Sequence, residues 1–149
     1  MIIYLDCDGT WIDLYGVNNW LDYLIKENPY PYIHAKPMVH LSTFARIIHQ
    51  LQKKGIKVGI ISWLSKNGSD TYNQLVTQAK YNYFKQHLPS VTFDEIHIIK
   101  YGTPKSTCIS EKNAILFDDE EKNREEWQGV AAYSEHDLIK HLKEIAQTI

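Results

Sequence analysis

The chain has 149 residues, a length that predicts one domain spanning residues 1–149 with a sizeable core. Its 16 basic and 18 acidic side chains give a net charge of −2 with histidine neutral, so bulk charge favours neither a stable nucleic-acid complex nor a membrane surface. No apolar run is long enough to cross a bilayer, and no basic leader precedes the first apolar segment. Two cysteines, Cys7 and Cys108, are too few for a disulfide framework. We therefore expect a cytoplasmic protein with free thiols and no membrane partner.

The first predicted strand, Ile2–Leu5, runs directly into Asp6 and Asp8 and then into Gly9 and Thr10. A short, continuous apolar run is typical of a buried strand in a parallel sheet. Ligands of such sheets bind beyond the carboxyl ends of the strands, so both carboxylates are expected at the rim of a crevice. Carboxylates this close together resist joint ionisation unless a cation offsets their repulsion, and oxygen ligands suit Mg2+. The segment therefore predicts a magnesium-dependent site.

Residues 11–40 lack a regular pattern over most of their length. Apolar side chains recur at helical spacing only in residues 18–26, which predicts a short helix. Residues 28–32 are rich in proline and tyrosine, and we expect a loop there because proline interrupts a helix. Residues 11–40 are either a flap with one helix over the predicted crevice or a plain crossover connection. Residues 18–26 are either a mobile lid or a packed helix.

The rest of the chain alternates between helices and strands. The predicted helices are residues 41–54, 70–88 and 120–127, and a last one that ends near residue 146. The further predicted strands are residues 57–62, 95–99, 114–117 and 130–133. Candidate N-terminal caps are Ser42 for the first of these helices, Ser69 or Asp70 for the second, and Ser134 with Asp137 as a capping box for the last. The alternation predicts an α/β fold with a Rossmann-like, doubly wound, parallel five-stranded sheet.

Polar residues occur where the chain leaves these strands or approaches them. They are Ser62, Lys105 or Lys100, Asp118 and Asp119. Because the carboxyl ends of parallel strands meet at one edge of the sheet, we expect these side chains to converge on Asp6 and Asp8. Lys105 is preferred over Lys100 because it follows a turn and can reach back over the strand edge.

These residue types fit phosphoryl transfer to an aspartate. Asp6 is expected to attack phosphorus and form an aspartyl-phosphate, while Asp8 protonates the leaving oxygen and later accepts a proton from water. Ser62 is expected to donate a hydrogen bond to the phosphate, and the lysine to neutralise it. Asp118 completes the predicted Mg2+ site, together with Asp6 and the backbone carbonyl of Asp8.

Three segments resemble motifs of the haloacid dehalogenase (HAD) superfamily. Leu5-Asp6-Cys7-Asp8-Gly9-Thr10 resembles motif I, Ile60-Ile61-Ser62 resembles motif II, and residues 115–119 resemble motif IV in its double-aspartate form. The resemblance implies a HAD-like fold with a flap or minimal cap in residues 11–40, and a Mg2+-dependent phosphomonoester hydrolase. Asp8 favours phosphate esters over haloacids, because a dehalogenase needs no acid two residues after its nucleophile. The resemblance also implies that Asp119 contacts the metal ligands from outside the metal site.

Two further segments look like those of the small 5'(3')-deoxyribonucleotidase-like members of this superfamily. They are Asp118-Asp119-x-x-x-Asn123 with Trp127, and Tyr101-Gly102-Thr103-Pro104-Lys105. Because these members hydrolyse nucleoside monophosphates, the expected partner is a small phosphorylated substrate, specifically a nucleotide. Trp11 and Trp63 are the best-placed rings for stacking on a base, although aromatic side chains more often serve packing.

Three polar residues near the predicted site are less specific signals. Ser65 and Lys66 are candidate contacts to phosphate or sugar, with a solvated loop as the alternative for Lys66. Lys80 lies in the middle of a predicted helix and either points at the site or faces water. Two other functions stay open: a HAD-fold protein that binds a phosphorylated ligand with little catalysis, and a phosphatase that acts on phosphorylated nucleic-acid ends.

Overall fold

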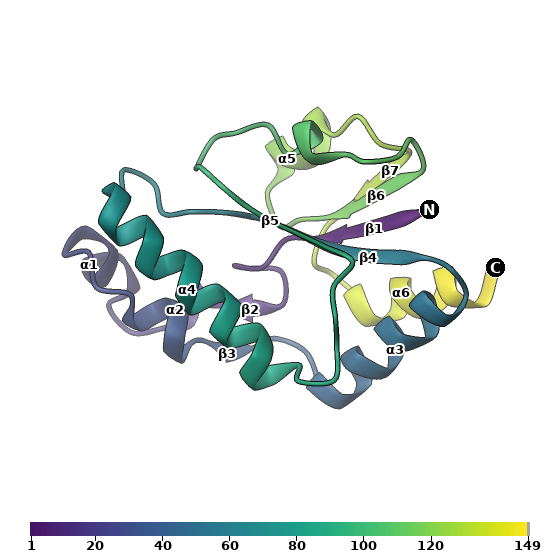
Figure 1. Ribbon diagram of the computed structural model, residues 1–149, viewed down its shortest axis with the longest axis horizontal. Coiled ribbons are helices and arrows are strands. Elements are labelled where there is room, and N and C mark those ends of the chain that lie inside the picture. The colour runs from purple at the N-terminus through teal and green to yellow at the C-terminus, as the bar shows by residue number, and fades with distance from the viewer. Residues whose placement is uncertain (149) are drawn as a thin grey trace.

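The computed structural model describes residues 1–148 and contains a central parallel sheet (Figure 1). Its strand order is β5-β4-β1-β6-β7. The bounds are Ile2–Leu5 for β1, Lys57–Trp63 for β4, Glu95–Ile99 for β5, Ala114–Phe117 for β6 and Ala131–Tyr133 for β7. From β1 the chain builds one half of the sheet outwards and then returns to build the other half. This confirms the predicted doubly wound fold and makes the carboxyl end of β1 the point where the winding reverses.

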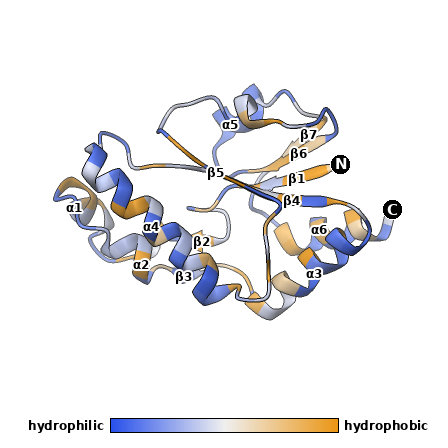
Figure 2. Ribbon diagram, viewed as in Figure 1, coloured by the Kyte–Doolittle hydropathy of each residue, from blue (hydrophilic) through white to orange (hydrophobic). Residues whose placement is uncertain are grey.

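Alternate residues of β1 enter two different apolar cores. Ile3 and Leu5 belong to the larger core, and Ile2 and Tyr4 to the smaller core on the opposite face. All four side chains are fully buried, which explains why the strand reads as an unbroken apolar run. Figure 2 shows mostly apolar strands inside the molecule and helices of mixed polarity around them.

Three long helices cover the face with the larger core (Figure 1). They are α3 (Leu41–Lys53), α4 (Asp70–His87) and α6 (Leu138–Thr148). The other face is covered by α5 (Glu121–Glu126) with the following Trp127, and by the chain around the 3-10 helix η2 (Lys105–Cys108). None of the helices in residues 1–148 combines the length and apolar character that a membrane span needs.

Two predicted helix caps are wrong. Helix α3 is capped by His40 rather than Ser42, because the His40 side chain accepts the hydrogen bond from the backbone N–H of Thr43. The capping box before α6 does not form: Ser134 accepts from the N–H of His136, and Asp137 turns the chain with a positive φ of 55°. The third predicted cap, Ser69 of α4, accepts from the N–H of Tyr72 at 3.1 Å.

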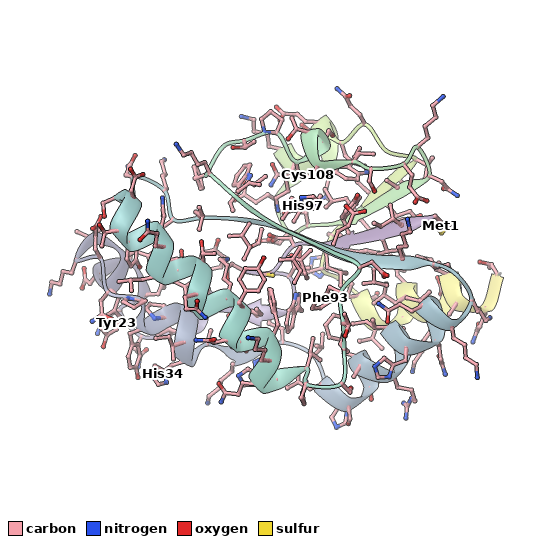
Figure 3. The ribbon with its side chains drawn as sticks, viewed as in Figure 1. Met1, Tyr23, His34, Phe93, His97 and Cys108 are labelled. Carbon is pink, nitrogen blue, oxygen red and sulfur yellow. The ribbon has the colours of Figure 1, made fainter. Side chains whose placement is uncertain are left out.

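Residues 11–40 form several short elements on the side towards which β1 runs (Figure 1). They are β2 (Ile12–Asp13), the 3-10 helix η1 (Leu14–Gly16), α1 (Trp20–Ile25), α2 (Tyr30–His34) and β3 (Lys36–Pro37). Strands β2 and β3 pair antiparallel and close the segment at its base. On its outer side, Tyr23 and His34, which are labelled in Figure 3, both pack against the ring of Tyr30, at centroid distances of 4.8 and 4.2 Å.

The expected loop at residues 28–32 is wrong, because α2 begins there. Pro29 is the N-cap and Pro31 lies in the first turn, where the backbone N–H has no partner inside the helix. Helix α2 packs against α4, so tertiary contacts stabilise a helix of only five residues.

Candidate active site

The ends of β1, β4 and β6 bring the predicted polar residues to one edge of the sheet. The N–H of Asp6 donates to the carbonyl of Phe117 at 2.9 Å, which holds the exits of β1 and β6 side by side. Asp6, Asp8, Asp118 and Asp119 line a cavity of about 710 Å³ there. Residues 11–40 supply part of the opposite wall, through Tyr32 and the apolar side chains of α1.

A tight turn after β1 sets the direction of the first carboxylate. The backbone N–H groups of Thr10, Trp11 and Ile12 all point at the carbonyl of Cys7, each at 3.1 Å. Gly9 has a φ of +82°, and a Cβ there would lie 2.4 Å from Oδ2 of Asp119, so only glycine fits.

The hydroxyl of Thr10 connects the two acidic segments. It lies 2.9 Å from Oδ2 of Asp6 and 3.3 Å from Oδ1 of Asp119, and it accepts from the N–H of Asp119 at 3.2 Å. These hydrogen bonds therefore join the turn after β1 to the loop after β6.

A buried lysine lies between two of the carboxylates. The Nζ of Lys105 donates to Oδ1 of Asp6 at 2.9 Å and to Oδ2 of Asp118 at 2.6 Å. Lys100, the alternative candidate, is exposed just after β5. Burial alone would lower the pKa of Lys105, but the charges of Asp6 and Asp118 outweigh it and hold that pKa above its usual value. Burial would likewise raise the pKa of Asp6, yet the Lys105 ammonium brings it below its usual value.

The pKa values of Asp118 and Asp119 are raised, unlike that of Asp6, because no nearby cation outweighs the effect of burial. Burial and the charge of Asp6 raise the pKa of Asp118 to about 6. Burial and contact with Asp6 raise the pKa of Asp119 to about 8. Carboxylate oxygens of all three residues lie within 4.8 Å of one another. Hard oxygen donors this close fit a Mg2+ ion, whose charge would lower these pKa values.

Asp8 has a partner that the sequence-based site did not include. The Nζ of Lys80, on α4, donates to Oδ2 of Asp8 at 2.8 Å and to Oγ of Ser62 at 2.7 Å. Burial raises the pKa of Asp8 above its usual value although the Lys80 charge opposes the shift. A signal was present in the sequence: Lys80 follows Tyr72 and Val76 at a spacing of four, on the buried face of the helix.

The prediction that Trp11 contacts the substrate is wrong. Its ring is fully buried and packs on Phe44, Tyr83 and Phe84, at centroid distances of 5.4, 5.9 and 5.9 Å. Although Trp11 follows the first motif directly, the turn at Gly9 directs it into the core rather than into the cavity.

The other predicted substrate contacts line the cavity. Trp63 packs on Tyr101 at a centroid distance of 4.8 Å, and Lys66 lies over the same tyrosine ring at 5.7 Å. Ser65 is buried at the cavity wall. Helix α1 contributes an apolar wall with Trp20, Leu21, Leu24 and Ile25.

No protein-family model and no curated protein sequence matches the chain. Its structure is similar to the crystal structure of D,D-heptose 1,7-bisphosphate phosphatase from Burkholderia thailandensis, with a TM-score of 0.60 over 97% of both chains. The fold is HAD-like. Because only 10% of the aligned residues are identical, this similarity extends to the fold alone.

Proposed function

We propose that this protein is a Mg2+-dependent phosphomonoester hydrolase that acts through an aspartyl-phosphate, with nucleoside monophosphates as substrates. One observation carries the proposal: two carboxylates two residues apart line the same cavity, and each is paired with a different buried lysine, Asp6 with Lys105 and Asp8 with Lys80. Asp6 is kept ionised beside Lys105, as a nucleophile must be, and burial raises the pKa of Asp8, as a general acid requires.

The reaction would proceed in two displacements. A carboxylate oxygen of Asp6 attacks phosphorus, the bond from phosphorus to the ester oxygen breaks, and Asp8 gives its proton to the leaving oxygen. Water then attacks the phosphorus of the aspartyl-phosphate and yields its proton to Asp8, which releases inorganic phosphate and restores Asp6. Ser62 and Lys105 would donate hydrogen bonds to the phosphate, and neither side chain changes its protonation during the cycle.

Asp6, Asp118 and Asp119 would hold the metal ion, with the backbone carbonyl of Asp8 as a further oxygen donor. When bound, Mg2+ would offset the repulsion between an anionic nucleophile and an anionic phosphate.

The walls of the cavity support a substrate whose leaving group carries an aromatic base. Trp63 and Tyr101 present adjacent rings, and α1 adds an apolar surface on the other side. Stacking of a base on such rings contributes about 1–3 kcal/mol. A sugar phosphate alone would leave these rings without a partner, so a nucleoside fits the cavity better.

The test is phosphate release from a panel of nucleoside monophosphates and from phenyl phosphate, with and without Mg2+. Asp6→Asn should abolish turnover, whereas Asp70→Asn, an exposed aspartate on α4, serves as the matched control with wild-type rates. Metal-dependent release from phenyl phosphate alone would keep the hydrolase and discard the nucleotide. Undiminished turnover in a folded Asp6→Asn protein would refute the mechanism.

A further inference from the structure

Lys80 is a buried lysine whose contacts all lead to the candidate active site. Its side chain is 3% exposed, whereas Lys85 on the same helix is exposed to solvent. Burying an ammonium group costs free energy unless the group is paired. If Lys80 served only for packing, an apolar side chain would fill the same space without that cost. Lys80 makes an ion pair with Asp8 and a hydrogen bond to Ser62 at the same time.

The direction of these two hydrogen bonds follows from the chemistry of the ammonium group. Lysine has three N–H donors and no acceptor, so Lys80 donates in both bonds. The Oγ of Ser62 is therefore an acceptor towards Lys80, and its own hydrogen is left for another acceptor. In the same way, Oδ2 of Asp8 accepts the hydrogen bond from Lys80, so Oδ1 is the oxygen that can exchange a proton with a substrate.

A third contact connects Lys80 to the segment above the cavity. The Nζ lies 5.1 Å from the centre of the Tyr32 ring, on α2, a distance typical of a cation–π interaction. Tyr32 is itself buried and lines the cavity. Lys80 is thus fixed from three sides, by the turn after β1, by the end of β4 and by α2.

We propose that Lys80 is a positioning residue that orients the acid–base carboxylate of Asp8 and the hydroxyl of Ser62 towards the same phosphate ester. This inference rests on the proposed hydrolase function. Lys80 holds one oxygen of Asp8 so that the other faces the leaving group, and it turns the Ser62 hydrogen towards the phosphate. It differs in this from Lys105, which contacts the nucleophile Asp6.

The test compares two aryl esters in Lys80→Met, which keeps most of the length of the side chain without its charge. Phenyl phosphate needs a proton on its leaving oxygen, whereas 2,4-dinitrophenyl phosphate does not. We expect kcat/KM, which reports the steps up to departure of the leaving group, to fall about 100-fold with phenyl phosphate and less than about tenfold with the dinitrophenyl ester, because only the first needs the acid in those steps. Lys85→Met is the matched control and should keep wild-type kcat/KM with both esters.

Equal losses with both esters, or no loss with either, would overturn the proposal. Should Lys80→Met not fold, Asp8→Asn is compared with the double variant Asp8→Asn/Lys80→Met, which removes both members of the ion pair. With the dinitrophenyl ester, the second substitution should then lower kcat/KM by less than about tenfold, because the contribution through Asp8 is already removed and only that through Ser62 remains. A much larger further loss would contradict positioning through Asp8.

A binding measurement separates failure of this inference from failure of the proposed function. Calorimetric titration of inorganic phosphate in the presence of Mg2+ needs no turnover. Lys80→Met should weaken phosphate binding about tenfold relative to Lys85→Met, since the Ser62 hydroxyl loses its orientation. Equal affinity in both variants overturns the role of Lys80 even in an active enzyme. A wild-type protein that binds phosphate without hydrolysing esters overturns the hydrolase and leaves the orienting role to the binding data.

Discussion

At the scale of single residues, Lys105 is the cation on which the acidic cluster depends. It neutralises Asp6 and Asp118 from a buried position. We expect Lys105→Met to lower the free energy of unfolding of the metal-free protein by about 3–5 kcal/mol, because breaking a buried ion pair leaves uncompensated charge. Turnover should fall at least about 100-fold, since a charge that stabilises the transferring phosphate is lost. Urea unfolding and phosphate release measure the two effects.

Lys100→Met is the matched control for this prediction. Lys100 is exposed only five residues before Lys105, and its loss should leave stability and turnover close to wild type. Comparable losses in the two variants would contradict the assignment of Lys105. Excess Mg2+ should restore part of the stability of Lys105→Met, because the ion supplies positive charge to the same carboxylates.

At the scale of elements, Glu27 fastens α1 to the start of α4. Its carboxylate accepts from the hydroxyl and the N–H of Ser69, at 2.6 and 2.9 Å, and these bonds hold the pKa of Glu27 below its usual value. Ser69 also caps α4, so one residue joins the cavity wall to the long helix.

We expect Glu27→Gln to loosen the wall that α1 forms. KM for nucleoside monophosphates should rise by up to about fivefold, as befits an exposed contact, while kcat with phenyl phosphate stays unchanged. Glu144→Gln, at an exposed position of α6, is the control in the same steady-state assay. A fall in kcat with both substrates would instead assign Glu27 to the chemistry.

The elements also show which features could be predicted from the sequence. Strands β1 and β6 match their predicted bounds, because a strand buried on both faces is an uninterrupted apolar run. Strand β5 also matches its predicted bounds, although its side chains are only half-buried and include Glu95 and His97. Helix α2 was missed because the stabilising contacts with α4 lie far away in the sequence. Asp6, Ser62 and Asp118 were correctly predicted to lie at one edge of the sheet, because the carboxyl ends of parallel strands meet at the same edge.

The direction of a side chain is harder to predict than its place in the chain. Trp11 follows the first motif but turns into the core, and Lys80 lies in a polar helix but points at Asp8. Local propensity is the same for either direction, so only packing against distant residues decides between them. Tertiary contacts therefore decided both cases.

At the scale of the whole molecule, the reversal of the sheet winding gathers four aspartates around one cavity. Charges of one sign at one place destabilise the fold unless protons or cations compensate them. The raised pKa values of Asp118 and Asp119, about 6 and about 8, mean that the folded chain takes up protons there that the unfolded chain releases. Protonation of the site and the free energy of unfolding are thereby coupled.

This coupling predicts how stability depends on pH. A group whose pKa is raised from 3.8 to about 8 on folding, as for Asp119, contributes stability that is present below pH 3.8 and is lost as the pH rises through 8. In EDTA, the melting temperature should therefore fall between pH 6 and pH 8. Asp119→Asn should flatten the decline over this range, because the amide does not titrate.

Magnesium should reverse the decline. The ion binds the deprotonated carboxylates, so its affinity should increase with pH, and at 100 times Kd it should add about 2.7 kcal/mol to the free energy of unfolding. Thermal melts at pH 6 and pH 8, with MgCl2 or with KCl of equal ionic strength, distinguish binding from screening. A stabilisation of equal size in both salts, or one that is larger at pH 6, would show that Asp6, Asp118 and Asp119 do not form the metal site.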